Sequence, residues 1–151
     1  MSEPWGSVFL VVAGGWAGVL GFGIVGIALR VKRAGIERAW PALRVWAPWL
    51  DLYGTWAGAL AVAALALGRV GIGAGWAVAM VSCALGVTAG LYGRAVLMPS
   101  LDAAFKRMRA APDESKWAEE WEFLWRMATA ARALSLLLTG VAIACIAPLL
   151  W

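Results

Sequence analysis

Four long stretches of the chain are apolar and nearly free of charge. Residues 7–29 contain no charged side chain, and similar stretches cover residues 50–68, 71–97 and 127–150. A helix rises about 1.5 Å per residue, so roughly 20 apolar residues cross the hydrocarbon core of a bilayer. The pattern predicts an all-α polytopic membrane protein, with a single membrane domain over residues 1–151 built as an antiparallel bundle of four transmembrane helices.

The connections between these stretches hold most of the positive charge. Eleven of the thirteen Lys and Arg residues fall in segments 30–51 and 94–126. Positive charges that flank membrane helices are retained on the cytoplasmic side. We therefore expect cytoplasmic loops at 30–49 and 98–126, both termini outside the cytoplasm, and a bacterial inner membrane as the location. Arg69 falls in the tight turn expected between the second and third spans on the opposite side.

Small residues recur at four-residue spacing within the predicted spans. Apolar burial does little to bring helices together in lipid, so close approach through small residues has to supply van der Waals contact. One interpretation is that these rows pack the bundle against itself. The other is that the first helix uses a second glycine face to contact another subunit. The candidate packing or partner-contact residues are Gly14, Gly18, Gly21, Gly54, Gly58, Gly86 and Gly90.

The segment after Pro112 has the pattern of an amphipathic helix that precedes the last span. Trp117, Trp121 and Trp125 recur every four residues, which places their rings along one stripe of a helix. A helix of this kind is expected to lie along the headgroup boundary on the cytoplasmic side. The stripe serves either as a set of interfacial anchors or as a docking surface for a partner or a flat hydrophobic ligand.

Three charged residues fall within or at the ends of the predicted spans. Asp51 opens the second span, Arg94 closes the third, and Arg132 lies early in the fourth. All three are expected at a similar depth, so we predict a buried charge cluster in which Asp51 pairs with Arg132 or with Arg94. Charges inside a membrane are costly and mark functional sites by default. The cluster is either a structural clasp or a proton or substrate site.

Composition supports the membrane interpretation and removes several classes of function. Hydrophobic residues make up 63% of the chain and charged residues only 15%, whereas soluble domains carry about a quarter charged residues. The net charge of +4 lies beside apolar stretches, which argues against a nucleic-acid partner. With no His, the chain lacks a common ligand for haem, zinc and copper. We expect no cofactor, no metal site and no catalytic residue.

The last third of the chain resembles a known group of membrane proteins. The segments that carry the likeness are Gly93-Arg-Ala-Val-Leu-Met-Pro99, Phe123-Leu-Trp-Arg126 and Leu134-Ser-Leu-Leu-Leu138. They resemble small four-helix bacterial membrane families that include the anthrone-oxygenase-like proteins. The resemblance implies a four-helix bundle and a cofactor-free membrane enzyme. The chain departs from these families at Trp125, where related members often carry a His.

These patterns lead to a ranked set of functional hypotheses. The first is a non-catalytic accessory or assembly subunit that packs against a larger membrane complex or against itself. The second is a binder or carrier of a hydrophobic small molecule, in a cavity lined by Trp16, Trp56 and Trp76. The third is the cofactor-free enzyme that the resemblance implies. The expected partners are the lipid bilayer and another membrane protein or a second copy of the chain.

Overall fold

The computed structural model describes residues 3–68, 73–112 and 114–149, and nearly all of them are helical. Four helices in this part of the chain are long and apolar enough to cross a membrane, so the predicted all-α fold with four such helices is confirmed. Arg69 lies outside the described residues. The elements in chain order are α1 (Glu3–Ala34), α2 (Ile36–Gly68), α3 (Ala74–Tyr92), the π-helical turn η1 (Gly93–Leu97), α4 (Met98–Ala110), α5 (Ser115–Ile146) and the 3-10 turn η2 (Ala147–Leu149).

The connection between α1 and α2 is a single glycine. Gly35 has φ of +71°, a backbone conformation that residues with a Cβ rarely adopt. Its N–H donates to the carbonyl of Val31 at 3.0 Å, and its carbonyl accepts from the N–H of Ala39 at 3.1 Å. One bond closes α1 and the other opens α2, as at a left-handed helix C-terminus. The segment 30–49, which we expected to be a loop, is therefore helical apart from this residue.

The second expected loop, 98–126, is also mostly helical. The chain passes from α3 through η1 into α4 without leaving a helical conformation, and Pro99 lies in the first turn after η1. Beyond a short break before Ser115, α5 continues without interruption to Ile146. The amphipathic segment that we expected before the last span is therefore the first part of α5 and not a helix of its own. No Gly or Pro occurs between 115 and 139 to interrupt the helix.

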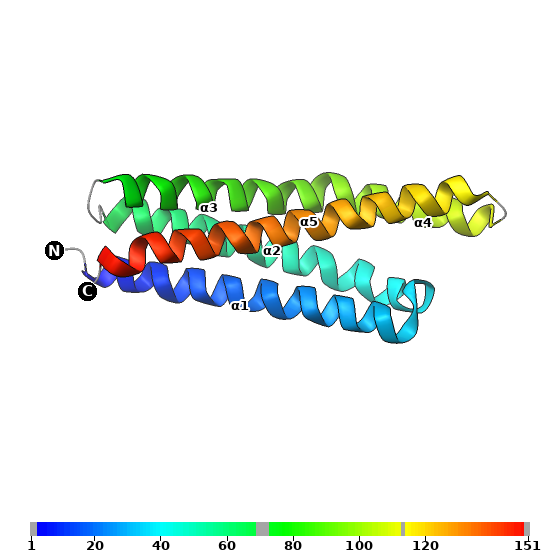
Figure 1. The fold of residues 1–151 in the computed structure, drawn as a ribbon, viewed down its shortest axis with the longest axis horizontal. Coiled ribbons are helices and arrows are strands. Elements are labelled where there is room, and N and C mark those ends of the chain that lie inside the picture. The colour runs from blue at the N-terminus through cyan, green and yellow to red at the C-terminus, as the bar shows by residue number, and fades with distance from the viewer. Residues whose placement is uncertain (1–2, 69–72, 113, 150–151) are drawn as a thin grey trace.

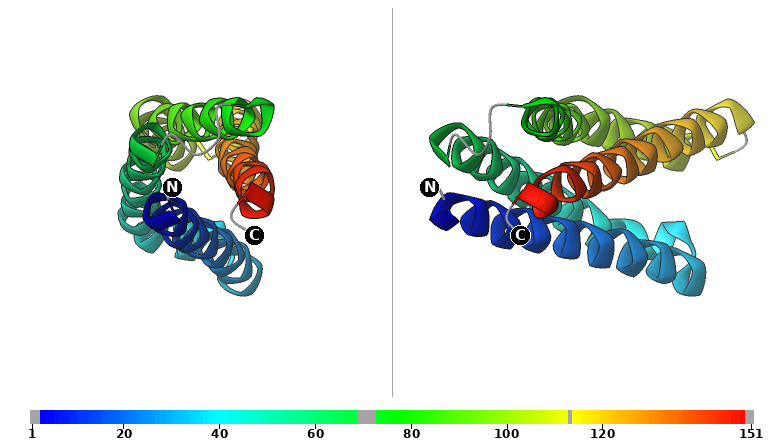
Figure 2. Two further views of the ribbon diagram at one scale, coloured as in Figure 1. Left: turned by 90° about the vertical axis from the view of Figure 1, so that its left-hand side faces the viewer. Right: turned by 60° about the vertical axis from the view of Figure 1, so that its left-hand side comes forward.

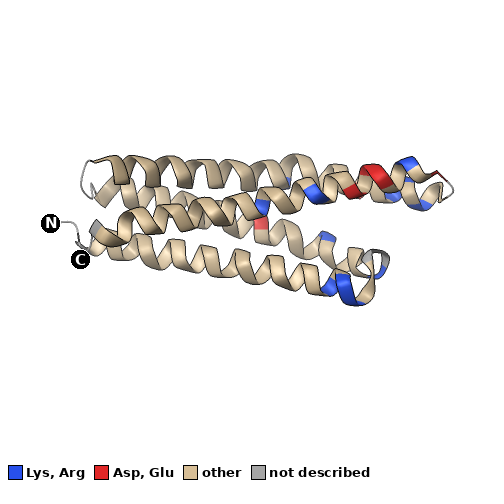
Figure 3. Ribbon diagram, viewed as in Figure 1, with Lys and Arg blue, Asp and Glu red and all other residues tan. Residues whose placement is uncertain are grey.

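The four long helices form a ring. Viewed along the bundle, α1, α2, α3 and α5 occupy its four sides (Figure 2, left). From the side, α2 and α5 cross the bundle diagonally, so that one end of the molecule is compact and the other end is splayed (Figure 1). We call the end near Gly68 and Ala74 the closed end and the end near Gly35 the charged end. The described Lys and Arg residues gather toward the charged end (Figure 3).

The middle of the bundle is filled by one indole. The Trp16 side chain is completely buried, and it lies against three glycines of the facing helices α2 and α3. A Cβ on Gly54 would stand 3.0 Å from the Trp16 Nε1, and a Cβ on Gly86 would stand 3.0 Å from its Cη2. A Cβ on Gly58 would stand 2.7 Å from the same Cη2 atom. The glycines therefore make the space that this large side chain occupies.

Aromatic side chains also join α2 to α4 and α5 near the charged end. Trp40 of α2 contacts Phe105 of α4 with ring centroids 5.4 Å apart, and it meets Trp121 of α5 edge-on at 5.9 Å. Offset and edge-to-face contacts of this kind stabilise buried aromatic clusters. These rings therefore hold α2 against α4 and α5 at the charged end.

Candidate functional site

Asp51 of α2 and Arg132 of α5 form a buried ion pair. The Arg132 Nε donates to Asp51 Oδ1 at 2.9 Å, and its Nη2 donates to Asp51 Oδ2 at 2.8 Å. The Arg132 side chain is 7% exposed and the Asp51 side chain is 2% exposed. This two-pronged arrangement matches the planar guanidinium to the carboxylate and is the strongest common geometry for such a pair. The sequence left two partners open for Asp51, and the structure pairs it with Arg132.

The ion pair is sealed on the side of α3. The cavity next to it has a volume of about 10 Å³ and is lined partly by Gly90, Gly93 and Ser135, which is space for about one water molecule at most. The Met98 sulfur accepts from the Arg132 Nη2 at 3.6 Å. On this side, the pair therefore has little space for a ligand.

Arg94, which we expected in the same buried cluster, is exposed. The residue before it, Gly93, is the one that faces the pair, since a Cβ there would stand 3.7 Å from Asp51 Oδ2. Adjacent residues of a helix point in different directions, so Arg94 points away. It lines a shallow surface pocket with Arg44 instead.

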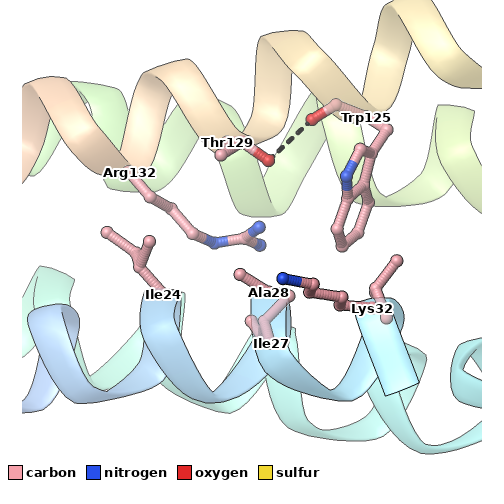
Figure 4. Close-up of a pocket in the computed structure, with 8 residues that line it drawn as sticks. Ile24, Ile27, Ala28, Lys32, Trp125, Thr129 and Arg132 are labelled. Atoms are coloured by element: carbon pink, nitrogen blue, oxygen red, sulfur yellow. Dashed lines mark hydrogen bonds between the residues drawn. The ribbon is translucent and has the colours of Figure 1, made fainter. Parts of the chain in front are cut away.

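A larger cavity opens between α1 and α5 and reaches Arg132. Its volume is about 300 Å³. Apolar side chains of α1 form one wall, and the Trp125 ring and Thr129 stand on the other (Figure 4). The Thr129 hydroxyl donates to the Trp125 carbonyl at 3.0 Å. The lining residues are Ile24, Ile27, Ala28, Val31, Lys32, Trp125, Thr129 and Arg132.

Two cationic side chains enter this cavity from opposite helices. In Figure 4 the guanidinium of Arg132 and the ammonium of Lys32 point toward each other above Ala28. No carboxylate lines the cavity among the described residues, because Asp51 lies on the far side of Arg132. The site therefore combines apolar walls with local positive charge.

The tryptophan stripe of α5 is used inside the molecule. Trp121 is buried and stacks on Trp125 with ring centroids 5.5 Å apart and 14° between the planes. Trp117 is half-buried, with the Arg107 guanidinium 5.3 Å and the Lys116 ammonium 4.7 Å from its ring. The three rings therefore do not form one exposed stripe: Trp121 is part of the core, Trp125 lines the cavity and Trp117 lies beside two cations.

The predicted glycine contacts divide into two groups. Gly54, Gly58 and Gly86 face the Trp16 indole. A Cβ on Gly90 would stand 3.4 Å from the Thr55 hydroxyl oxygen. Gly21 stands near Leu136 of α5, at 4.0 Å by the same measure. These five residues pack the bundle against itself. Gly14 and Gly18 instead have nothing within 4 Å of a built Cβ and are exposed.

The three tryptophans expected to line one cavity do not lie together. Trp16 fills the core, Trp56 is 65% exposed, and Trp76 is half-buried with its Nε1 donating to the Leu65 carbonyl at 3.0 Å. The prediction that these rings form a ligand cavity is wrong. Their spacing along the chain indicated similar depth in a membrane, but it did not indicate which helix face each ring would occupy.

Lys32 is the site residue that sequence reasoning missed. We assigned it to a loop, yet α1 continues through it to Ala34. A signal was present: Ile24, Ile27, Ala28 and Val31 follow the helical spacing of one face, and Lys32 comes one turn after Ala28. Extending this periodicity past Leu29 would have placed Lys32 on the same face.

Comparisons of the chain with protein-family models, with curated proteins and with solved structures found no match. The resemblance of the last third to anthrone-oxygenase-like families stays a prediction. Among the residues that the structure describes, no three His, Cys, Asp or Glu side chains are grouped as metal ligands usually are. The site is therefore interpreted from its own geometry.

Proposed function

We propose that this protein is a multi-pass membrane protein that binds a hydrophobic molecule from the bilayer in the cavity between α1 and α5. The observation that carries the proposal is the cavity itself. It has about 300 Å³ of space, within the range of small-molecule sites. It opens between two apolar helices, and a buried ion pair lies at its inner wall.

The surface of the bundle supports placement in a membrane as an antiparallel four-helix protein. Phe22 is 82% exposed and Val11 is 75% exposed on the outside of α1, and contiguous apolar surface of this kind is costly in water. The described Lys and Arg residues gather at the charged end (Figure 3). By the positive-inside rule, this end faces the cytoplasm of a bacterial cell.

This orientation places the ion pair within the cytoplasmic half of the bilayer. Asp51 lies about 25 Å along α2 from Gly68 at about 1.5 Å per residue, within a hydrocarbon core of about 30 Å. The cavity then opens sideways at the level of the cytoplasmic leaflet. A membrane-dissolved molecule could enter it without crossing water.

An accessory or self-associating subunit is the second candidate. Burial of Trp121 and of the inward glycines removes most of the surface that first suggested it. The outer face of α1 still supports it, because Gly14 and Gly18 are exposed beside Phe22 and small residues favour close helix contacts in lipid. Gly18→Leu would block such a contact, and a lower oligomer mass in mild detergent than for the unmodified protein would support this candidate.

The binding proposal is tested with an uncharged probe. Radiolabelled dodecanol is equilibrated with the protein in nanodiscs of zwitterionic lipid, and uptake by protein-free nanodiscs is subtracted. We expect saturable binding near one probe per protein, and Ala28→Trp should abolish it because the new ring fills the cavity. Ala63→Trp, at an exposed position of α2 away from the cavity, is the matched control. Equal non-saturable uptake by all three proteins would overturn the proposal.

A further inference from the structure

The geometry points to an anionic ligand: we infer that the α1–α5 cavity takes a single-chain amphiphile whose carboxylate or phosphate head lies between Arg132 and Lys32. This inference rests on the proposed binding function and specifies the class of ligand. Three features of the cavity support it, namely the donors left on Arg132, the approach of a second cation, and the amount of apolar space.

Arg132 has hydrogen-bonding capacity that its partners do not use. An arginine carries N–H donors on each of its three nitrogens. Asp51 accepts from Nε and Nη2, and Met98 accepts from Nη2. Among the described residues, no hydrogen bond involves Nη1, although the side chain is only 7% exposed. Nη1 is not among the fully enclosed side-chain nitrogens that lack a partner, so an acceptor can reach it, and Arg132 lines the α1–α5 cavity.

Lys32 adds a second positive charge to the same space. Its ammonium points toward the Arg132 guanidinium (Figure 4), and it forms no salt bridge with the side chains that the structure describes. Like charges that converge in a partly apolar site repel each other. With Asp51 balancing Arg132, the local charge is one positive unit, which a singly charged anion between the two cations neutralises.

The remaining space fits one chain. About 300 Å³ corresponds to roughly ten water-sized groups, which is space for most of one alkyl chain. The end of a longer chain would extend out through the opening between α1 and α5. The walls that would contact it are apolar: Ile24, Ile27 and Val31 on α1 and the Trp125 ring on α5. The two chains of a phospholipid would exceed this space, so a single-chain carboxylate or phosphate is the better fit.

Dodecanoate, dodecyl phosphate and dodecanol share one chain and differ in the head, so they test the charge directly. Binding of radiolabelled dodecanoate and dodecanol is measured in zwitterionic nanodiscs, with dodecyl phosphate as the competitor. We expect dodecanoate to bind about tenfold more tightly than dodecanol, as for a hydrogen bond to a charged group. Stronger competition by dodecyl phosphate than by unlabelled dodecanoate would assign the head as phosphate, and the reverse order as carboxylate.

Lys32→Gln should weaken dodecanoate binding by about fivefold, the upper range for a solvent-accessible charge, and leave dodecanol binding unchanged. Arg33→Gln is the matched control, because it removes the same charge from the next residue, which does not line the cavity. Equal loss in both variants would mean that surface charge merely attracts the anion, and would overturn the inference. Equal affinity for dodecanoate and dodecanol would also overturn it while leaving the proposed function intact. Failure of both probes would instead refute the proposed function.

Discussion

The middle of the bundle and the space between α1 and α5 at the charged end are built from the same helices but packed in opposite ways. Around Trp16, glycines on α2 and α3 bring backbones close to a large ring, and the interior is filled. Toward the charged end, α1 separates from α5, and Ala28 faces space instead of a ring. The contrast shows how one bundle can be filled at one level and open at another. Where a large side chain faces small residues the interior is filled, and where small residues face no large side chain a cavity remains.

The largest effect is expected where the two regions meet. Asp51→Leu leaves the Arg132 guanidinium buried without its carboxylate, and it should lower the free energy of unfolding by about 3–5 kcal/mol. Unfolding by SDS in mixed micelles, followed by circular dichroism, measures the change. The paired variant Asp51→Leu with Arg132→Met is the control, because it removes both charges, and it should recover most of the loss. A double variant as unstable as the single one would mean that shape, rather than charge, holds this level together.

A single methyl group tests how full the middle of the bundle is. Gly58→Ala places a Cβ 2.7 Å from Trp16 Cη2, so overpacking should destabilise the protein by about 1–3 kcal/mol. Gly14→Ala is the matched control, since nothing lies within 4 Å of its Cβ and better helix propensity should stabilise it by about 0.5 kcal/mol. The same SDS titration compares the two variants. Equal stability of both would contradict the packing described around Trp16.

The open region should accept added volume. Ala28→Leu points its new methyl groups into the α1–α5 cavity, so the free energy of unfolding should change by less than about 0.5 kcal/mol, while dodecanol binding weakens. Thermal unfolding in nanodiscs and the radiolabelled probe measure the two properties. A large loss of stability with binding retained would show that the cavity is not the binding site.

The smallest effect is expected outside both regions. Arg107 and Glu120 join α4 to α5 at 3.2 Å, but both side chains are well exposed, and exposed pairs contribute little. Glu120→Gln should therefore change the free energy of unfolding by less than about 0.5 kcal/mol. A change as large as that of Asp51→Leu would show that α4 and α5 depend on this contact. The difference between the effects of Glu120→Gln and Asp51→Leu on the free energy of unfolding also reports how much of the Asp51 effect comes from burial of the ion pair.

The helices were predictable from the sequence because uncharged stretches of this length leave few other folds. The bidentate pairing of Asp51 with Arg132 was one of two expected options, and helix depth alone could not distinguish Arg132 from Arg94. That choice depends on which face of the helix carries Gly93. The cavity was not predictable, because it arises from the angle between α1 and α5 and from the extension of α1 to Lys32. Similarly, the packing of Trp121 depends on Trp40, which is 81 residues earlier in the chain.

The π-helical turn η1 changes the direction in which the residues of α4 face. In an α-helix each residue turns by about 100°, so positions five apart, such as Gly93 and Met98, would differ by about 140°. A π-helix bonds residues five apart and brings them nearly into line. Gly93 can therefore lie beside Asp51 while Met98 meets Arg132. The turn acts as a one-residue insertion that resets the angular phase of α4, so the helix presents two consecutive turns to the same ion pair.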